Sequence, residues 1–100
     1  MKYSIKEKSA LAYLASLKLK QRGMAVVWRS TIHLHGVSKA DFLANEAWLR
    51  HELEHVRQFR QYGLVRFLYL YLLESLRKGY HNNRFEIEAR AAEHRAGNND

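Results

Sequence analysis

Residues 50–59 of the chain read RHELEHVRQF. His51 and His55 stand four positions apart in it, and Glu52 directly follows the first histidine. Apolar residues recur around the pair at helical spacing: Leu49, Leu53 and Val56. This pattern predicts an amphipathic helix that docks on a core through its apolar stripe. The two imidazoles then share one helix face, one turn apart, near the edge of that stripe.

Length and composition predict one small folded domain spanning residues 1–100. The chain has 100 residues, of which 47% are hydrophobic and 12% aromatic, which is typical of a folded domain rather than a disordered chain. It has no cysteine, which excludes a disulfide scaffold and a cysteine-ligated zinc site. A metal site in this chain must therefore use histidine, aspartate or glutamate.

The formal charge of +7 would suit nucleic acid, an anionic membrane or an acidic partner. The basic residues are scattered, without a tight run or interleaved aromatics, so nucleic-acid binding is the weaker alternative. We expect Arg57 and Arg60 to be largely solvated. The amino terminus lacks the features of a signal peptide, and the run LVRFLYLYLLESL is too short and too charged to span a membrane. The expected compartment is the cytoplasm.

Along the chain, residues Ser4–Gln21 are predicted to form a helix, with Gly23 after its end. The leucines on one side of that helix are Leu11, Leu14 and Leu17. The segment MAVVWRSTIHLHG, residues 24–36, predicts a strand or a hairpin that turns near Arg29 and Ser30. Three further helices follow, with predicted caps at Ser38, Asn45 and Asn83 and predicted ends at Gly63 and Gly79. The two long ones span Glu46–Tyr62 and about Leu64–Lys78, a polar loop YHNN follows, and the last helix spans Arg84–Arg95. The predicted fold class is α+β and helix-dominated, with a short hairpin or edge strand before the helix of residues 46–62.

The pattern H-E-x-x-H has a chemical use on a helix. Zinc binds neutral imidazole nitrogens and carboxylate oxygens, and a catalytic site keeps one position for water. The ion lowers the pKa of that water, and a nearby carboxylate takes its proton. His51 and His55 are then the ligands, and Glu52, on the flank of the pair, is the general base. The alternative is an ordinary solvated helix that carries the pattern by chance.

A zinc enzyme needs a third protein ligand, and the residues alone leave several candidates open: Glu74, His81, Glu86 and Glu88. His33 and His35 point to the same side of a predicted strand, where a polar strand face is the more ordinary interpretation. Spacing does not choose among the other candidates.

The segment HELEH, followed much later by NRFEIEARAAE, resembles the gluzincin metallopeptidases. In that family a glutamate on a later helix, often in E-x-x-A-D or E-x-x-S-D, is the third ligand. The match of Glu86 to E-x-x-A implies that it is the ligand and that Glu88 faces elsewhere. The whole chain resembles the single-domain minigluzincins, closely over Met24–Glu93 and loosely over the first helix, which implies a minimal zincin fold.

One position departs from the family pattern, because Arg90 stands where these proteins often have aspartate. That aspartate orients a ligand histidine, and a guanidinium cannot accept a hydrogen bond from an imidazole N–H. We expect another acceptor to replace it: a backbone carbonyl, Asn82 or Glu93. A donor to the developing oxyanion is also needed, and Tyr80 and His81 are the candidates just before the last helix.

The function predicted on these grounds is zinc-dependent hydrolysis of peptide bonds in a peptide or protein substrate. The alternatives are a zincin-fold zinc protein without peptidase activity and a basic helical nucleic-acid-binding protein. A peptidase of this type binds its substrate as an added strand. We expect Thr31–His35 to be that edge, with Ile32 and Leu34 towards the core. A central, fully paired position for this strand would favour the non-catalytic zinc protein.

Overall fold

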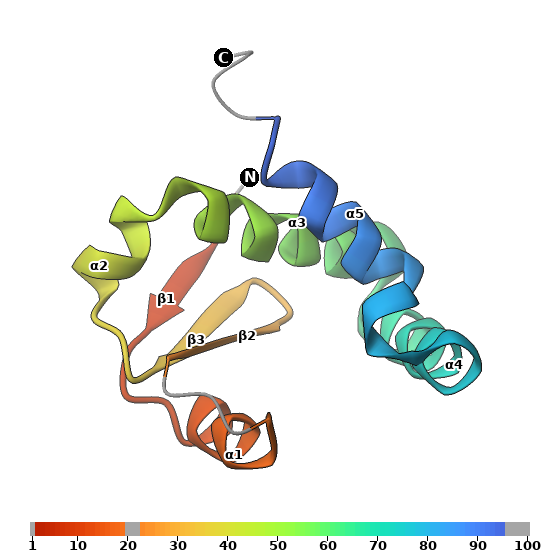
Figure 1. The fold of residues 1–100 in the computed structure, drawn as a ribbon, viewed down its shortest axis with the longest axis horizontal. Coiled ribbons are helices and arrows are strands. Elements are labelled where there is room, and N and C mark those ends of the chain that lie inside the picture. The colour runs from red at the N-terminus through yellow and green to blue at the C-terminus, as the bar shows by residue number, and fades with distance from the viewer. Residues whose placement is uncertain (1, 20–22, 96–100) are drawn as a thin grey trace.

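The computed structural model describes residues 2–19 and 23–95 and shows a small sheet flanked by helices (Figure 1). The elements are β1 (Ser4–Lys6), α1 (Ala10–Leu19), β2 (Met24–Trp28), β3 (Thr31–His35), α2 (Lys39–Ala44), α3 (Glu46–Tyr62), α4 (Leu64–Asn82) and α5 (Arg84–Ala92). The predicted helix-dominated α+β class is confirmed. None of the described helices is long and apolar enough to cross a membrane.

The helix caps predicted from the sequence are confirmed. Such caps can be predicted because each depends on one side chain close in sequence to the amide that it binds. Ser38 Oγ accepts from the Asp41 amide at 3.0 Å, and Asn45 Oδ1 accepts from the Trp48 amide at 3.1 Å. Asn83 Oδ1 accepts from the Phe85 amide at 2.8 Å. These caps begin α2, α3 and α5 respectively.

The amino-terminal segment differs from the predicted helix. Ser4–Lys6 is a strand, Lys8 has a positive φ of 52°, and α1 begins only at Ala10. Ser9 directly precedes the helix: its carbonyl accepts from the Tyr13 amide at 2.9 Å, and its Oγ accepts from the Ala12 amide at 3.4 Å. The predicted end at Gln21 lies outside the described residues.

The face that α1 buries is not the one that carries its leucines. The helix buries Ala12 and Ser16 instead of its leucines. Small side chains let the helix approach the sheet closely, and the leucines on its other side are exposed: Leu11, Leu14 and Leu17.

The sheet has the strand order β1-β3-β2, so the prediction that Thr31–His35 is an edge strand is wrong. β3 pairs in parallel with β1, from Ser4↔Thr31, and antiparallel with β2 through the hairpin turn at Arg29 and Ser30. Arg29 has φ 59°, the left-handed conformation that such tight turns use. The predicted alternation along β3 is confirmed, since Ile32 and Leu34 are fully buried.

The carboxyl-terminal helices have slightly different ends from those predicted. Gly79 does interrupt α4, with φ 81° and ψ 164°, but residues 80–82 form a further helical turn instead of a polar loop. Helix α5 ends at Ala92 instead of Arg95.

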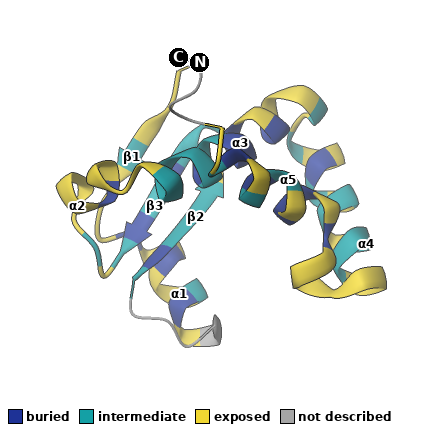
Figure 2. Ribbon diagram, turned by 45° about the horizontal axis from the view of Figure 1, so that its top comes forward, coloured by how far each residue is buried: buried dark blue, intermediate teal, exposed yellow. Residues whose placement is uncertain are grey.

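Helix α3 lies between the sheet and α5 and joins two apolar clusters (Figures 1 and 2). One cluster packs α3 on the sheet through Ile32, Leu34, Phe42 and Val56. The other packs α3 on α4 and α5 through Phe59, Phe67 and Phe85. Because both clusters hold the same helix, the orientation of its His51 face is fixed relative to sheet and helices alike.

Candidate metal centre

Helix α3 brings His51 and His55 together as their spacing predicts. Their ring centroids are 5.2 Å apart. His55 is buried and His51 partly buried, because the stripe that contains Val56 faces the core and draws the adjacent face inward. The pair therefore lies in a recess of the protein instead of on an open helix surface.

Helix α5 brings Glu86 to the pair. Asn83, fully buried at the start of α5, donates through Nδ2 to the Tyr71 carbonyl at 3.1 Å and to Ser75 Oγ at 2.9 Å. These bonds fix the first turn of α5 against α4. Glu86 lies in that first turn, where a carboxylate is also favoured by the helix dipole.

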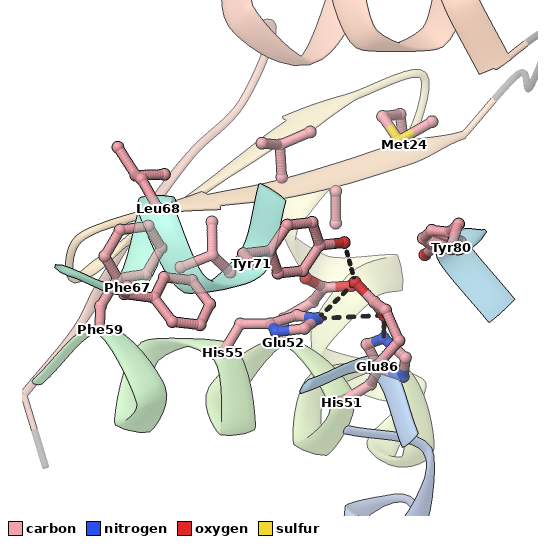
Figure 3. Close-up of a pocket in the computed structure, with 13 residues that line it drawn as sticks. Met24, His51, Glu52, His55, Phe59, Phe67, Leu68, Tyr71, Tyr80 and Glu86 are labelled. Carbon is pink, nitrogen blue, oxygen red and sulfur yellow. Dashed lines mark hydrogen bonds and ion pairs between the residues drawn. The ribbon is translucent and has the colours of Figure 1, made fainter. Parts of the chain in front are cut away.

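The three side chains converge on one point (Figure 3). His51 Nε2 lies 3.2 Å from Glu86 Oε1, and His55 Nε2 lies 3.3 Å from the same carboxylate. One nitrogen or oxygen from each residue lies within 4.8 Å of the others. Ligands about 2.0–2.1 Å from a tetrahedral zinc stand about 3.3 Å from one another. The donor types and the two histidine–carboxylate distances are compatible with a metal ion held by His51, His55 and Glu86.

The other candidates for the third ligand lie elsewhere. Glu88 contacts Gln58 and Arg57, and Glu74 accepts from the Arg84 amide at 3.0 Å, beside Lys78. The strand histidines face α1: His33 Nδ1 lies 2.9 Å from Ser9 Oγ, and the ring of His35 contacts Tyr13.

The outer nitrogen of each imidazole has its own acceptor. His51 Nδ1 lies 2.7 Å from Glu93 Oε2, so Glu93 is the one of the three acceptors proposed from the sequence that the structure places there. His55 Nδ1 lies 2.9 Å from Gln58 Oε1, a residue with no exposed surface. Arg90 instead donates to the His81 carbonyl at 2.5 Å. Such acceptors fix ring orientation and leave Nε2 available to a metal.

Because the three side chains lie close together, the pKa values of His51, His55 and Glu86 are shifted in the metal-free protein. Burial by itself would lower the pKa of His55, but the hydrogen bond and charge of Glu86 outweigh it and raise that pKa to about 9. The pKa of His51 is raised as well, because its carboxylate partners outweigh its burial. The pKa of Glu86 is held low, since hydrogen bonds from both histidines outweigh the cost of burying its charge.

Glu52 stands apart from this ligand set although it is next to His51 in sequence. Its side chain is buried, and burial raises its pKa to about 7 despite the two nearby histidines. It lines the same pocket as the histidines and Glu86. A carboxylate whose pKa lies near neutral pH is suited to take and return a proton.

Two tyrosines also line the pocket. The Tyr71 hydroxyl donates to Glu86 Oε2, and the pKa of Tyr71 is raised by burial and by that carboxylate. Tyr80 lines the pocket near Met24, and burial raises its pKa to about 12 (Figure 3). His81 is exposed and does not line the pocket. Tyr71 was not among the candidates from the sequence, since it sits in an apolar helical run typical of core residues.

The pocket has a volume of about 240 Å³ and lies between β2 and the helices. Its sheet-side wall is Met24–Val27, and Phe59, Phe67 and Leu68 form an apolar end (Figure 3). Comparison with family models, curated proteins and solved structures finds no match for this chain.

Proposed function

We propose that the protein is a zinc-dependent peptidase of minimal gluzincin type. One observation carries the proposal: a His51–His55–Glu86 group with zinc-like spacing and a separate buried carboxylate, Glu52, open into one pocket. A purely structural site would have no need of the second carboxylate, whose burial costs free energy.

His51, His55 and Glu86 would hold the ion. When bound, zinc supplies a Lewis acid that polarises a carbonyl and makes water a stronger acid. Glu52 accepts the proton of the attacking water and returns it to the leaving amine. The Tyr71 hydroxyl, which already points to Glu86, is placed to donate to negative charge that develops beside the group.

The substrate would lie along β2. In a two-residue hairpin the residues flanking the turn bond to each other, so Trp28, Val26 and Met24 direct their backbone groups towards β3. The N–H and C=O groups of Ala25 and Val27 then point to the outer edge. No other described strand pairs there, and this part of β2 lines the pocket. An extended peptide can pair with this edge beside Glu86 and the two histidines.

The central position of β3 bears on the alternative of a zinc protein without peptidase activity. It removes Thr31–His35 as a docking edge and, taken alone, favours that alternative. Two observations favour the peptidase again: β2 offers an edge in the pocket itself, and within residues 2–19 and 23–95 no fourth histidine, aspartate or glutamate joins the group. A coordination position is thus left for water.

The test compares zinc content and peptide hydrolysis in the wild type and Glu52→Gln. We expect one zinc per chain in both proteins, and a loss of hydrolysis of about 100- to 10,000-fold in the variant. Glu46→Gln is the matched control, because Glu46 is an exposed glutamate in the first turn of the same helix. Absence of zinc from the wild type, or full activity in Glu52→Gln, would overturn the proposal.

A further inference from the structure

We propose that Glu93 is the positioning residue of His51 and that Arg50 anchors it in that role. The inference rests on the proposed metal site. It assigns to the carboxyl-terminal end of α5 a part in setting metal affinity, although Glu93 lies outside the ligand group itself.

The geometry separates a positioning role from a ligand role. Glu93 Oε2 lies 2.7 Å from Nδ1 of His51, whereas Nε2 of the same ring faces Glu86 at 3.2 Å. The two ring nitrogens point in different directions, so Glu93 is behind the ring when seen from the metal group. A carboxylate has no proton to give, hence Nδ1 donates and the lone pair of Nε2 is kept for a metal.

Arg50 fixes the backbone that carries this carboxylate. Its Nε and Nη2 both donate to the Glu93 carbonyl, at 3.2 and 2.8 Å. Arg50 immediately precedes His51 on α3, so one helix provides both the ligand and the anchor of its hydrogen-bond acceptor. A cation at the end of α5 is also favoured by the helix dipole. Rotation of the His51 ring would therefore break a contact that the same helix holds in place.

The second histidine is held by different chemistry. His55 Nδ1 bonds to Oε1 of the Gln58 side chain. Gln58 Nε2 in turn donates to the Phe85 carbonyl at 3.1 Å and to Glu88 Oε1 at 2.9 Å. That acceptor is neutral and fully buried, whereas Glu93 is charged and its side chain is 31% exposed. A carboxylate acceptor makes its imidazole a stronger ligand than an amide does. The strength with which His51 binds a metal therefore depends on Glu93, a partly exposed residue.

The test uses Glu93→Ala, Glu93→Gln and a matched control, Glu46→Ala. Arg50 Nη1 also donates to Glu46 Oε1, at 3.4 Å, but Glu46 is not a hydrogen-bond partner of His51 or His55. Zinc affinity is measured by competition with a chelator. We expect Glu93→Ala to bind zinc about 10- to 100-fold more weakly and Glu46→Ala to match the wild type. Glu93→Gln, which keeps an acceptor oxygen, should recover most of the loss.

A second measurement does not depend on zinc. In the metal-free protein, NMR should show a slowly exchanging Nδ1–H proton on His51 that is present in Glu46→Ala and Glu93→Gln and absent in Glu93→Ala. If that proton persists in Glu93→Ala, or if zinc affinity there equals that of the wild type, the inference is wrong. If the wild type binds no zinc, the proposed function fails while the proton signal still decides the position of Glu93. If Glu93→Ala does not fold, a Glu93→Gln variant without the proton would overturn the inference.

Discussion

Gln58 and His55 form a hydrogen-bonded pair one helical turn apart, with Oε1 2.9 Å from Nδ1, in the fully buried interior between α3 and α5. The pair makes the sequence HELEHVRQ more than a ligand motif, since the acceptor that orients the second histidine lies on the same helix. The orientation of His55 is therefore determined locally, whereas that of His51 depends on a residue 42 positions away.

Replacement of Gln58 by leucine should destabilise the fold and weaken zinc binding. Leucine has a similar volume but leaves His55 Nδ1–H without a partner in the interior, and it removes the bonds from Gln58 Nε2 to the Phe85 carbonyl and to Glu88. Each unpaired group costs about 1–3 kcal/mol, so urea denaturation should show a loss of about 1–3 kcal/mol or more. Gln61→Leu, at an exposed position on α3, is the control and should change little. Equal stability of the two variants would contradict the assigned role.

Zinc affinity should rise with pH. In the metal-free protein the pKa of His55 is raised from 6.5 to about 9, so this imidazole carries a proton at neutral pH. Zinc binds only the neutral ring, hence apparent affinity should increase about tenfold per pH unit from this proton alone until the pH passes 9. Calorimetry in buffers of different ionisation enthalpy measures the released proton. Binding without proton release at pH 7 would contradict the charge state assigned to His55.

The same pKa predicts an opposite trend for the stability of the metal-free protein. A pKa that is higher in the folded than in the unfolded state adds stability that is fully present below pH 6.5. That contribution is lost as the pH rises through about 9. Denaturation of the metal-free protein should therefore become easier between pH 7 and 9.5, and Glu86→Gln should remove most of the trend. Its persistence in that variant would assign it to other groups.

Much of the fold follows from local sequence chemistry. The caps at Ser38, Asn45 and Asn83 and the helix end at Gly63 depend on neighbouring residues only, and the structure has them where the sequence predicts. Gly79 interrupts the helical conformation as predicted, although α4 continues to Asn82. The histidine pair needed only the helical period. These features require no knowledge of which segments meet in space.

The features that the sequence did not predict depend on distant contacts. β1 is three residues long and acquires its strand conformation by pairing with β3, at Ser4↔Thr31. That pairing makes β3 central and leaves β2 as the edge beside the pocket. Tyr71 reaches Glu86 because α4 and α5 are held together, by the bond from Asn83 to the Tyr71 carbonyl and by the apolar cluster of Phe67 and Phe85. The residue pattern of a single segment cannot predict such a contact between distant segments.

A proline at Val27 should impair substrate binding while leaving the sheet paired. The Val27 N–H points to the outer edge of β2, so its loss removes one bond to a substrate strand and none to β3. One lost hydrogen bond of about 0.5–1.5 kcal/mol should raise KM about 2- to 12-fold. Val26→Pro is the contrasting variant, since the Val26 N–H points to β3, and it should lower stability instead. An unchanged KM in a folded Val27→Pro protein would exclude β2 as the docking edge.

Glu86→Ala and Glu88→Ala should differ sharply in zinc binding, although they remove the same group two positions apart. The Glu86 carboxylate lies 3.2 Å from His51 Nε2 and 3.3 Å from His55 Nε2. Glu88 instead accepts from Gln58 Nε2 and lies near Arg57. Structural zinc binding of about 10–16 kcal/mol shared among four ligands gives about 2.5–4 kcal/mol for each. Glu86→Ala should therefore bind zinc about 100- to 1,000-fold more weakly. Glu88→Ala should stay within about tenfold of the wild type, because it alters only a partner of the His55 acceptor. Zinc titration of the two purified variants measures the zinc affinity of each. If Glu88→Ala loses zinc and Glu86→Ala retains it, Glu88 is the third ligand and Glu86 is not.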